Sequence, residues 1–138
     1  MGQHIRDVMT ANPSTVEPNS TVVEAARIMK QADAGVVPVT ESGRLTGMVT
    51  DRDITIRVVA EGKDPTSTKV GEIASTDLVT VDPQQDLDEA LRLMAQHKVR
   101  RLAVVEEDGR LVGVLAQADV AREGDDAQTG EVVQEISE

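Results

Sequence analysis

The sequence predicts an α/β (α+β) fold in which two tandem β-α-β-β-α repeats pack as a pseudo-two-fold pair. The two halves of the 138-residue chain align on each other in register, apart from one inserted residue at Asp108. In each half, apolar residues recur at the spacings of strands and of a helix in the same order. One half is too short to bury a comfortable core alone, so the two halves are expected to pack together.

The internal repeat also sets the expected organisation of the chain. Three stretches keep the same residue types in both copies: Thr15–Pro18 aligns with Thr80–Pro83, Glu24–Met29 with Glu89–Met94, and Gly43–Gly47 with Gly109–Gly113. We therefore expect a first repeat at residues 1–62, a linker at 63–69, a second repeat at 70–124 and a flexible acidic tail at 125–138.

Three strands are expected in each repeat. A short strand followed by a proline opens each copy, at Ser14–Val16 and at Val79–Val81. Two apolar runs come after the first helix, and the polar, glycine-containing turn between them is typical of a hairpin. These runs are Val36–Thr40 and Leu45–Thr50 in the first copy, and Leu102–Val105 and Leu111–Leu115 in the second.

Two helices complete each repeat. The first helix begins with a capping box, which pairs Thr21 with Glu24 in one copy and Asp86 with Glu89 in the other. In the first copy this helix is expected to end near Gly35, and in the second copy it buries the face formed by Leu87, Ala90, Leu91 and Met94. The second helix is expected at Asp51 to about Glu61, and its counterpart starts near Gln117.

Composition excludes several classes of function. The chain has no Phe, Tyr or Trp, so a pocket for a base would lack aromatic stacking, and a net charge of −11 repels nucleic acid. With no Cys and only two His, metal sites and catalytic triads have few candidate residues, so an enzyme is disfavoured. No apolar run spans a bilayer and the start carries no signal-peptide pattern, which predicts a cytoplasmic protein that does not bind membranes.

Several motifs in order resemble one known family, the tandem CBS repeat or Bateman module. They are Ile5–Thr10 at the start, Val37-Pro38-Val39 on a strand, and Gly47–Ile54, which is similar to the family signature Gly-x-x-Thr/Ser-x-x-Asp. The likeness covers roughly Ile5 to Val120. It implies a non-catalytic module, commonly a homodimer, that binds an adenosine-containing ligand between its repeats.

The resemblance implies a main cleft that draws on both repeats. Asp53 would accept hydrogen bonds from the two ribose hydroxyls, Thr50 would lie toward the phosphate or ribose, and the loop 75–79 would meet the adenine through its backbone. Basic residues would face the phosphates. The implied residues of this cleft are Thr50, Arg52, Asp53, Ser75, Asp77, Val79, Arg100 and Arg101.

A second, weaker cleft would be formed by Thr10, Asn12, Ser14, Val37 and Asp119. It departs from the family pattern, because Ala116 stands where the first copy has Thr50. The first copy also has Gly35 and Val36 where the second has Arg100 and Arg101. This cleft therefore lacks a hydroxyl and the phosphate charges, and it is expected to be weak or empty.

Simpler interpretations stay open. Thr50 and Asp53 are also what a plain helix start requires, although Asp119 persists without a threonine cap, which favours a further role for that aspartate. Arg100 and Arg101 are adjacent in a strand, so one of them can point away from a cleft. The ligand could be AMP, ADP, ATP or another adenosine compound. The alternatives are a ligand-free scaffold that acts through a dimer surface and, least favoured, an enzyme; the effector partner is unknown.

Overall fold

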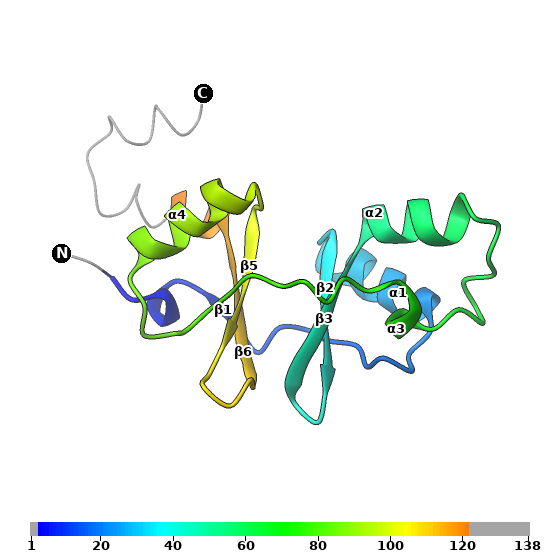
Figure 1. Cartoon of the computed structure of the whole chain (residues 1–138), viewed down its shortest axis with the longest axis horizontal. Helices are drawn as coiled ribbons and strands as arrows, with labels where there is room; N and C mark the ends of the chain where they lie inside the picture. Colours follow the sequence, from blue (N-terminus) through cyan, green and yellow to red (C-terminus); the bar gives the residue numbers. More distant parts are fainter. Residues whose placement is uncertain (1–2, 122–138) are drawn as a thin grey trace. The chain divides into compact units, whose positions relative to one another are not determined.

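Residues 3–121, which the computed structural model describes, form two units that each combine helices with a small sheet (Figure 1). Unit 2 consists of Pro13–Leu78 with Asp108–Leu111, and unit 1 of the segments up to Asn12, at Val79–Glu107 and from Val112 onward. The predicted α+β class is confirmed. The expected acidic tail at 125–138 lies outside the described residues.

The sheet of unit 2 is the antiparallel pair β2 (Val36–Glu41) and β3 (Arg44–Thr50). Ser42 and Gly43, between the strands, have φ values of 54° and 82°. Positive φ at both central residues is the backbone of a tight type I′ hairpin turn, which glycine adopts without strain. The predicted hairpin is therefore confirmed.

The strand expected at Ser14–Val16 is reduced to one residue. Val16 forms a parallel bridge with Val39: its N–H donates to the Pro38 carbonyl at 3.1 Å, and its carbonyl accepts from the Thr40 N–H at 2.8 Å. The next bond of such a parallel ladder, toward Ser14, would need an N–H donor at Pro38. Proline has none, so the pairing stops at Val16.

Helix α1 (Val22–Ala32) starts as the sequence predicts. The Oγ1 atom of Thr21 accepts from the N–H of Glu24 at 3.3 Å, which confirms the threonine half of the expected capping box. The helix ends three residues earlier than the expected Gly35, because Asp33 adopts the left-handed conformation with φ of 53°. Its buried face packs into the core of unit 2, whose buried members are Val16, Val22, Ala25, Met29, Val37, Val39, Val49, Val58, Val70 and Ile73.

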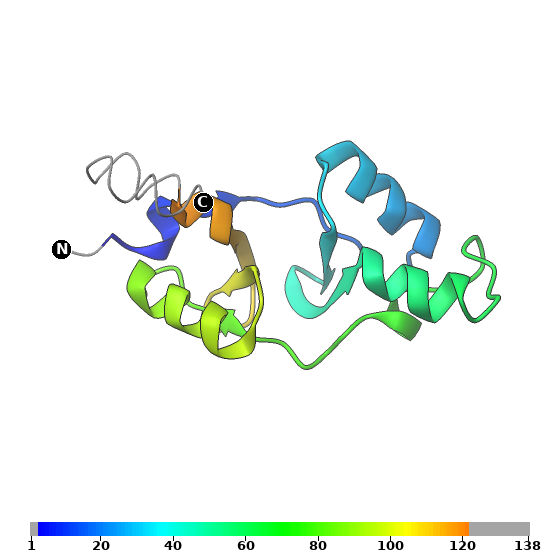
Figure 2. The same ribbon diagram turned by 90° about the horizontal axis from the view of Figure 1, so that it is seen from above.

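The helix after β3 changes register along its length. It starts as α2 (Asp51–Ile54) and continues as the π-helical segment η2 (Thr55–Val59). The start agrees with the sequence prediction, whereas the change to i→i+5 hydrogen bonds has no signal in the sequence. Both α1 and the α2–η2 helix lie on one side of the β2–β3 hairpin (Figure 2).

The expected linker packs closely against the start of α1. The carbonyls of Thr68 and Pro65 accept from the N–H groups of Val22 and Val23 at 3.0 and 3.3 Å, so they satisfy donors that a helix start leaves unpaired. The Thr66 hydroxyl and N–H both donate to the Asp64 carboxylate, which lowers the pKa of Asp64. The short helix α3 (Val70–Ile73) follows.

Unit 1 contains a four-stranded sheet with the order β1-β6-β5-β4. Its strands are β1 (Thr10–Ala11), β4 (Thr80–Val81), β5 (Arg101–Val105) and β6 (Leu111–Ala116). Strand β1 pairs antiparallel with β6, and β4 pairs parallel with β5. The strands expected from the second copy are therefore present, and a strand from the beginning of the chain adds to them.

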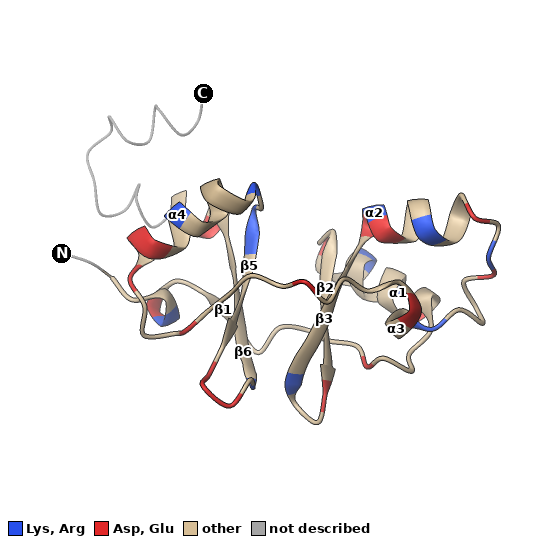
Figure 3. Ribbon diagram, viewed as in Figure 1, with Lys and Arg blue, Asp and Glu red and all other residues tan. Residues whose placement is uncertain are grey.

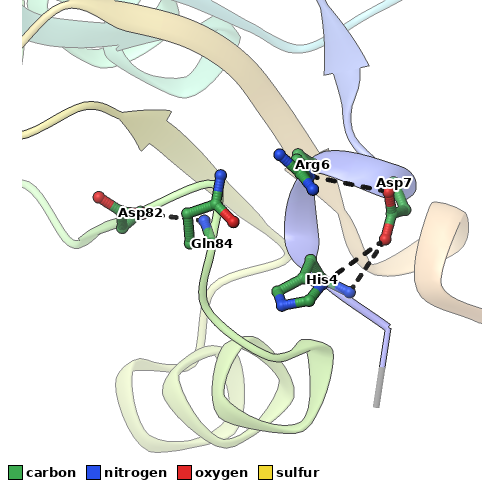
Figure 4. Close-up of polar contacts among 5 residues, drawn as sticks. All are labelled: His4, Arg6, Asp7, Asp82 and Gln84. Carbon is green, nitrogen blue, oxygen red and sulfur yellow. Dashed lines mark hydrogen bonds and ion pairs between the residues drawn. The ribbon is translucent and has the colours of Figure 1, made fainter.

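The start of the chain belongs to unit 1 rather than to the unit that holds the rest of the first repeat. The 3-10 helix η1 (Ile5–Asp7) places the fully buried Ile5 in a core with Leu102, Val104 and Leu115. Around it, the N–H of His4 donates to the Asp7 carboxylate at 3.2 Å (Figure 4). The expected division at residues 1–62 follows sequence order, whereas the units do not.

Helix α4 (Leu87–His97) corrects two expectations. Asp86 occupies the N-cap position but its side chain makes no capping hydrogen bond, so the second capping box is wrong; the Glu89 N–H donates to the Asp86 backbone carbonyl at 3.1 Å instead. Leu91 is 39% exposed, because the buried face runs through Leu87, Ala90 and Met94 and leaves Leu91 at its edge. After β6, residues 117–121 are helical, as expected from Gln117.

Candidate functional site

Thr50 and Asp53 form a complete capping box at the start of α2. The N–H of Asp53 donates to Thr50 Oγ1 at 3.0 Å, and the N–H of Thr50 donates to Asp53 Oδ2 at 2.9 Å. Both residues are half-buried. Thr50 and Asp53 therefore do cap the helix start, as the simpler interpretation of the sequence holds. The reciprocal bonds also fix the direction of both side chains.

Capping does not exhaust the hydrogen-bonding capacity of Asp53. An ionised carboxylate has about four acceptor positions, and the Thr50 N–H uses one of them. Within residues 3–121, no ion pair neutralises Asp53. An oriented, half-buried and unneutralised carboxylate is a suitable acceptor for a pair of hydroxyl groups on one ligand.

Asp119 also caps, although its copy has no threonine. The N–H of Ala116 donates to Asp119 Oδ2 at 3.2 Å, which is the carboxylate half of the box that Thr50 and Asp53 form in unit 2. The missing half is the one that a threonine hydroxyl would make. Helix capping is therefore one role of Asp119, as it is of Asp53.

The loop after α3 lies directly against β3. The N–H groups of Met48 and Ser75 donate to each other's carbonyls at 3.0 and 2.9 Å. A Cβ at Gly47 would lie 3.0 Å from the Ser75 carbonyl oxygen, so glycine is what permits this approach. The loop that carries Ser75 and the exposed Asp77 is thus in the same unit as Thr50 and Asp53, beside the strand that ends at Thr50.

Unit 1 repeats this arrangement. Thr10 on β1 pairs with Val114 on β6, and a Cβ at Gly113 would lie 2.9 Å from the Thr10 carbonyl oxygen. Thr10 and Asn12 are exposed, and Asn12 has a positive φ of 53°. Asp119 follows β6 in the same unit, so three of the five residues that the second cleft would use belong to unit 1.

The other predicted residues are distributed between the units. Arg100 and Arg101 are exposed at the start of β5 in unit 1, and the Arg100 carbonyl accepts from the Gln117 N–H at 2.8 Å. Val79 is half-buried in unit 1, Arg52 and Ser14 are exposed in unit 2, and Val37 is 1% exposed in the core of unit 2. Each predicted cleft draws on both units, and its assembly stays a prediction.

The two copies differ in charge beside their helix starts. In unit 2, a Cβ at Gly35 would lie 3.0 Å from a carboxylate oxygen of Asp51, so a larger residue there requires Asp51 to move. At the matching positions unit 1 has Arg100 and the uncharged Gln117. Figure 3 shows the basic start of β5 and the mixed charges at the start of α2. The second cleft was predicted to lack cations for phosphates, and the carboxylate of Asp51 adds a negative charge at that place.

Two further findings concern residues 3–121. No group of three or more His, Cys, Asp or Glu residues in this part of the chain could hold a metal ion. None of its helices has the length and apolar character that crossing a membrane requires.

Sequence reasoning missed one residue near the candidate site, Arg57, whose Nη1 donates to the Ile73 carbonyl at 3.1 Å; nothing in a linear pattern marks a contact of this kind.

Two similar α+β units, each with a capping aspartate after a strand and a loop against that strand, define a tandem-repeat protein. The model of the CBS domain matches residues 5–60 and residues 70–126. The chain belongs to the CBS domain family and carries two CBS domains in tandem.

Known members of the family resemble this chain over most of their length. The CBS domain-containing protein YhcV of Bacillus subtilis is 48% identical over 117 residues, which cover 85% of this chain and 82% of YhcV. The crystal structure of Hypoxic Response Protein I with two coordinated zinc ions matches with a TM-score of 0.80 and 40% identity, covering 87% of this chain and 98% of that one. The crystal structure of CBSX2 in complex with AMP matches at a TM-score of 0.78 and 27% identity, covering 89% and 96%.

Proposed function

We propose that this chain is a non-catalytic regulatory module that binds an adenosine-containing ligand such as AMP, ADP or ATP and signals to an effector protein. The observation that carries the proposal is the carboxylate of Asp53, which is oriented by its capping box and not neutralised by an ion pair within residues 3–121. The AMP complex of CBSX2 supports the same ligand class.

In the proposed main site, each part of the ligand meets a different group. Asp53 accepts from the ribose hydroxyls, and the loop of Ser75 and Asp77 meets the adenine together with Val79. Thr50 and the cations Arg52, Arg100 and Arg101 face the phosphates, where a guanidinium pairs with two oxygens at once. The number of arginines that converge would decide how long a phosphate chain is preferred.

The proposed second site, formed by Thr10, Asn12, Ser14, Val37 and Asp119, binds more weakly. Ala116 supplies no hydroxyl. Gly35 stands at the position that matches Arg100 of the main site, and the carboxylate of Asp51 lies beside it. Val37 is in the core, so its side chain has little surface for a ligand. We expect this site to be empty at concentrations that fill the main site.

One observation favours a second candidate function, a ligand-free scaffold. Asp53 and Asp119 both form capping hydrogen bonds, so the fold alone is a sufficient reason for both carboxylates. A scaffold would keep the two CBS domains and their surfaces but bind no nucleotide. Direct binding measurements separate the two functions.

The test is calorimetric titration of AMP, ADP and ATP into wild type, Asp53→Asn and Asp119→Asn. Asparagine keeps an oxygen that can accept the capping N–H, removes the charge, and replaces the second acceptor oxygen by an NH2 donor. We expect Asp53→Asn to weaken binding by about 1.5–3 kcal/mol, roughly ten- to a hundredfold, and Asp119→Asn to leave the main affinity nearly unchanged. Because the chain has no Phe, Tyr, Trp or Cys, absorbance near 260 nm also reports nucleotide carried through purification.

If no adenosine compound binds at millimolar concentration, the proposed ligand-binding function is refuted. The ligand-free scaffold then stays as the candidate function. Equal binding by wild type and Asp53→Asn would place the site elsewhere, and Asp119→Asn would then be the variant to examine.

We also propose that the chain forms a homodimer through the η2 helix. Ile56 and Val59 of that segment are 44% and 66% exposed, and such a pair of apolar side chains is suited to contact with a second copy. The hexameric CBS-CP12 protein shows that a similar chain assembles.

Sedimentation velocity should find a dimer for wild type and a monomer for Val59→Glu; a dimer with both would rule out this surface.

A further inference from the structure

The π-helical segment η2 carries a cation whose role the capping box and the loop do not explain. The N–H of Ala60 donates to the Thr55 carbonyl at 2.9 Å, the i→i+5 pattern of a π-helix. Short π segments within α-helices are rare and frequently lie at functional sites. Arg57 lies in the middle of this segment, four residues after Asp53 on the same continuous helix.

The guanidinium of Arg57 reaches the end of α3. Its Nη1 donates to the Ile73 carbonyl at 3.1 Å in a partly buried hydrogen bond. The last carbonyls of a helix have no partner within the helix, and a cation there also complements the helix dipole. Ile73 itself is 1% exposed in the core of unit 2, so the bond connects Arg57 to a core residue.

The chain that leaves Ile73 is the loop of the proposed site. Ala74 is extended, with φ of −69° and ψ of 147°, and Ser75 then pairs with Met48 through two backbone hydrogen bonds. Arg57 therefore links the helix that carries Asp53 to the segment that carries Ser75. Both belong to unit 2.

In the described part of the chain, Arg57 bonds to the Ile73 carbonyl and forms no ion pair with Asp53. In an α-helix, residues four apart are neighbours, and an arginine four residues after an aspartate commonly pairs with it. Within residues 3–121, neither Asp53 nor Arg57 takes part in an ion pair. One N–H of the Arg57 guanidinium is used by the Ile73 carbonyl, and the Asp53 carboxylate keeps acceptor positions for hydroxyl groups.

We infer that Arg57 is a positioning residue, which fixes the loop of Ser75 relative to the carboxylate of Asp53; the inference rests on the proposed function. The ribose and the base of one nucleoside must meet these two parts together, so their separation determines which bases fit. The matching position of the second copy is Glu123, which aligns with Arg57 as Asp119 aligns with Asp53. Glu123 lies outside the described residues.

The test compares Arg57→Met, Arg57→Lys and the control Arg27→Met, which alters an exposed arginine on α1 of the same unit. Methionine keeps an apolar stem and removes every donor, whereas lysine keeps one charged donor. Amide hydrogen exchange of Ser75 in the ligand-free full chain reports the loop. Calorimetry with AMP, GMP and ribose 5-phosphate reports the base and ribose parts separately.

We expect Arg57→Met to raise the exchange rate of the Ser75 amide about tenfold or more and to weaken AMP binding by a similar factor. The preference for AMP over GMP should fall toward unity, while ribose 5-phosphate binds within about twofold of wild type, since Asp53 stays in place. Arg57→Lys should restore most of both properties, and Arg27→Met should match wild type. A general loss of stability would lower all three affinities together.

Two results would overturn the inference: unchanged Ser75 exchange in Arg57→Met, or raised exchange with an unchanged ratio of AMP to GMP affinity. If wild type binds no adenosine compound, the proposed function fails. The exchange of Ser75 in the ligand-free protein still decides, in that case, whether Arg57 holds the loop.

Discussion

At the scale of single residues, the candidate site depends on close backbone approach as much as on charged groups. Gly47 and Gly113 occupy matching positions in the two copies, and each allows a loop or strand to lie against its neighbour. At Gly47 the nearest atom to an added Cβ would be the Ser75 carbonyl oxygen at 3.0 Å. This is a backbone atom, so a methyl group is accommodated only if the loop moves.

Gly47→Ala should therefore displace the loop of Ser75 and weaken AMP binding about tenfold, with a loss of stability of roughly 1–3 kcal/mol from overpacking. Gly113→Ala is the matched control, because its Cβ would meet Met9 and the Thr10 carbonyl in unit 1. It should lose similar stability and keep the main-site affinity. Urea unfolding and calorimetry give the two quantities, and equal affinity losses in both variants would count against the assignment of the main site to the loop of Ser75.

At the scale of elements, the two first helices look equivalent in sequence but start differently. Thr21 accepts the Glu24 N–H at α1, whereas the side chain of Asp86 makes no capping hydrogen bond at α4. The Glu89 carboxylate forms an ion pair with Arg92, and the Glu89 N–H is satisfied by a backbone carbonyl. The same pattern of residue types thus produces a side-chain cap in one copy alone.

This difference predicts unequal costs for the same kind of substitution. Thr21→Ala should lower the free energy of unfolding by about 1 kcal/mol, the usual value of a lost N-cap. Asp86→Ala should cost less than about 0.5 kcal/mol, since no capping bond is removed, although its charge near the helix start contributes a little. Urea denaturation of both variants decides; a cost at Asp86 equal to that at Thr21 would show that Asp86 caps in solution.

Local patterns predicted most of the local structure, with exceptions such as the cap at Asp86, and they did not predict contacts between distant segments. Periodicity and turn residues gave the hairpins and helix starts, because these depend on neighbours in sequence. A strand was expected at Ser14–Val16, but Pro38 on the neighbouring strand limits the pairing to Val16. The π-helical register of η2 has no periodic signal in the sequence. At the site, Thr50 and Asp53 were predicted from the family signature, whereas Arg57 was missed because its partner lies sixteen residues away.

At the scale of the whole molecule, the order of the repeats along the chain is not the order of packing. The first residues of the chain complete unit 1, where β1 pairs with β6 and the N–H of Ile5 donates to the Gln85 carbonyl at 2.9 Å. The first repeat thereby contributes to both units, and unit 1 requires the two ends of the described chain. Stability of the second repeat should consequently depend on residues at the start of the first.

Ile5 is the residue that measures this dependence. It is fully buried in the core of unit 1, so Ile5→Ala removes three methyl or methylene groups and leaves a cavity, which should cost about 2–4 kcal/mol. Leu91→Ala is the control in the same unit: the side chain is 39% exposed and should cost about 1 kcal/mol or less. Amide exchange in Ile5→Ala should rise mainly in β5 and β6, with α1 and β2 nearly unchanged. If exchange rose instead in α1 and β2, the first residues would pack with their own repeat in solution, and the composition of unit 1 would be wrong.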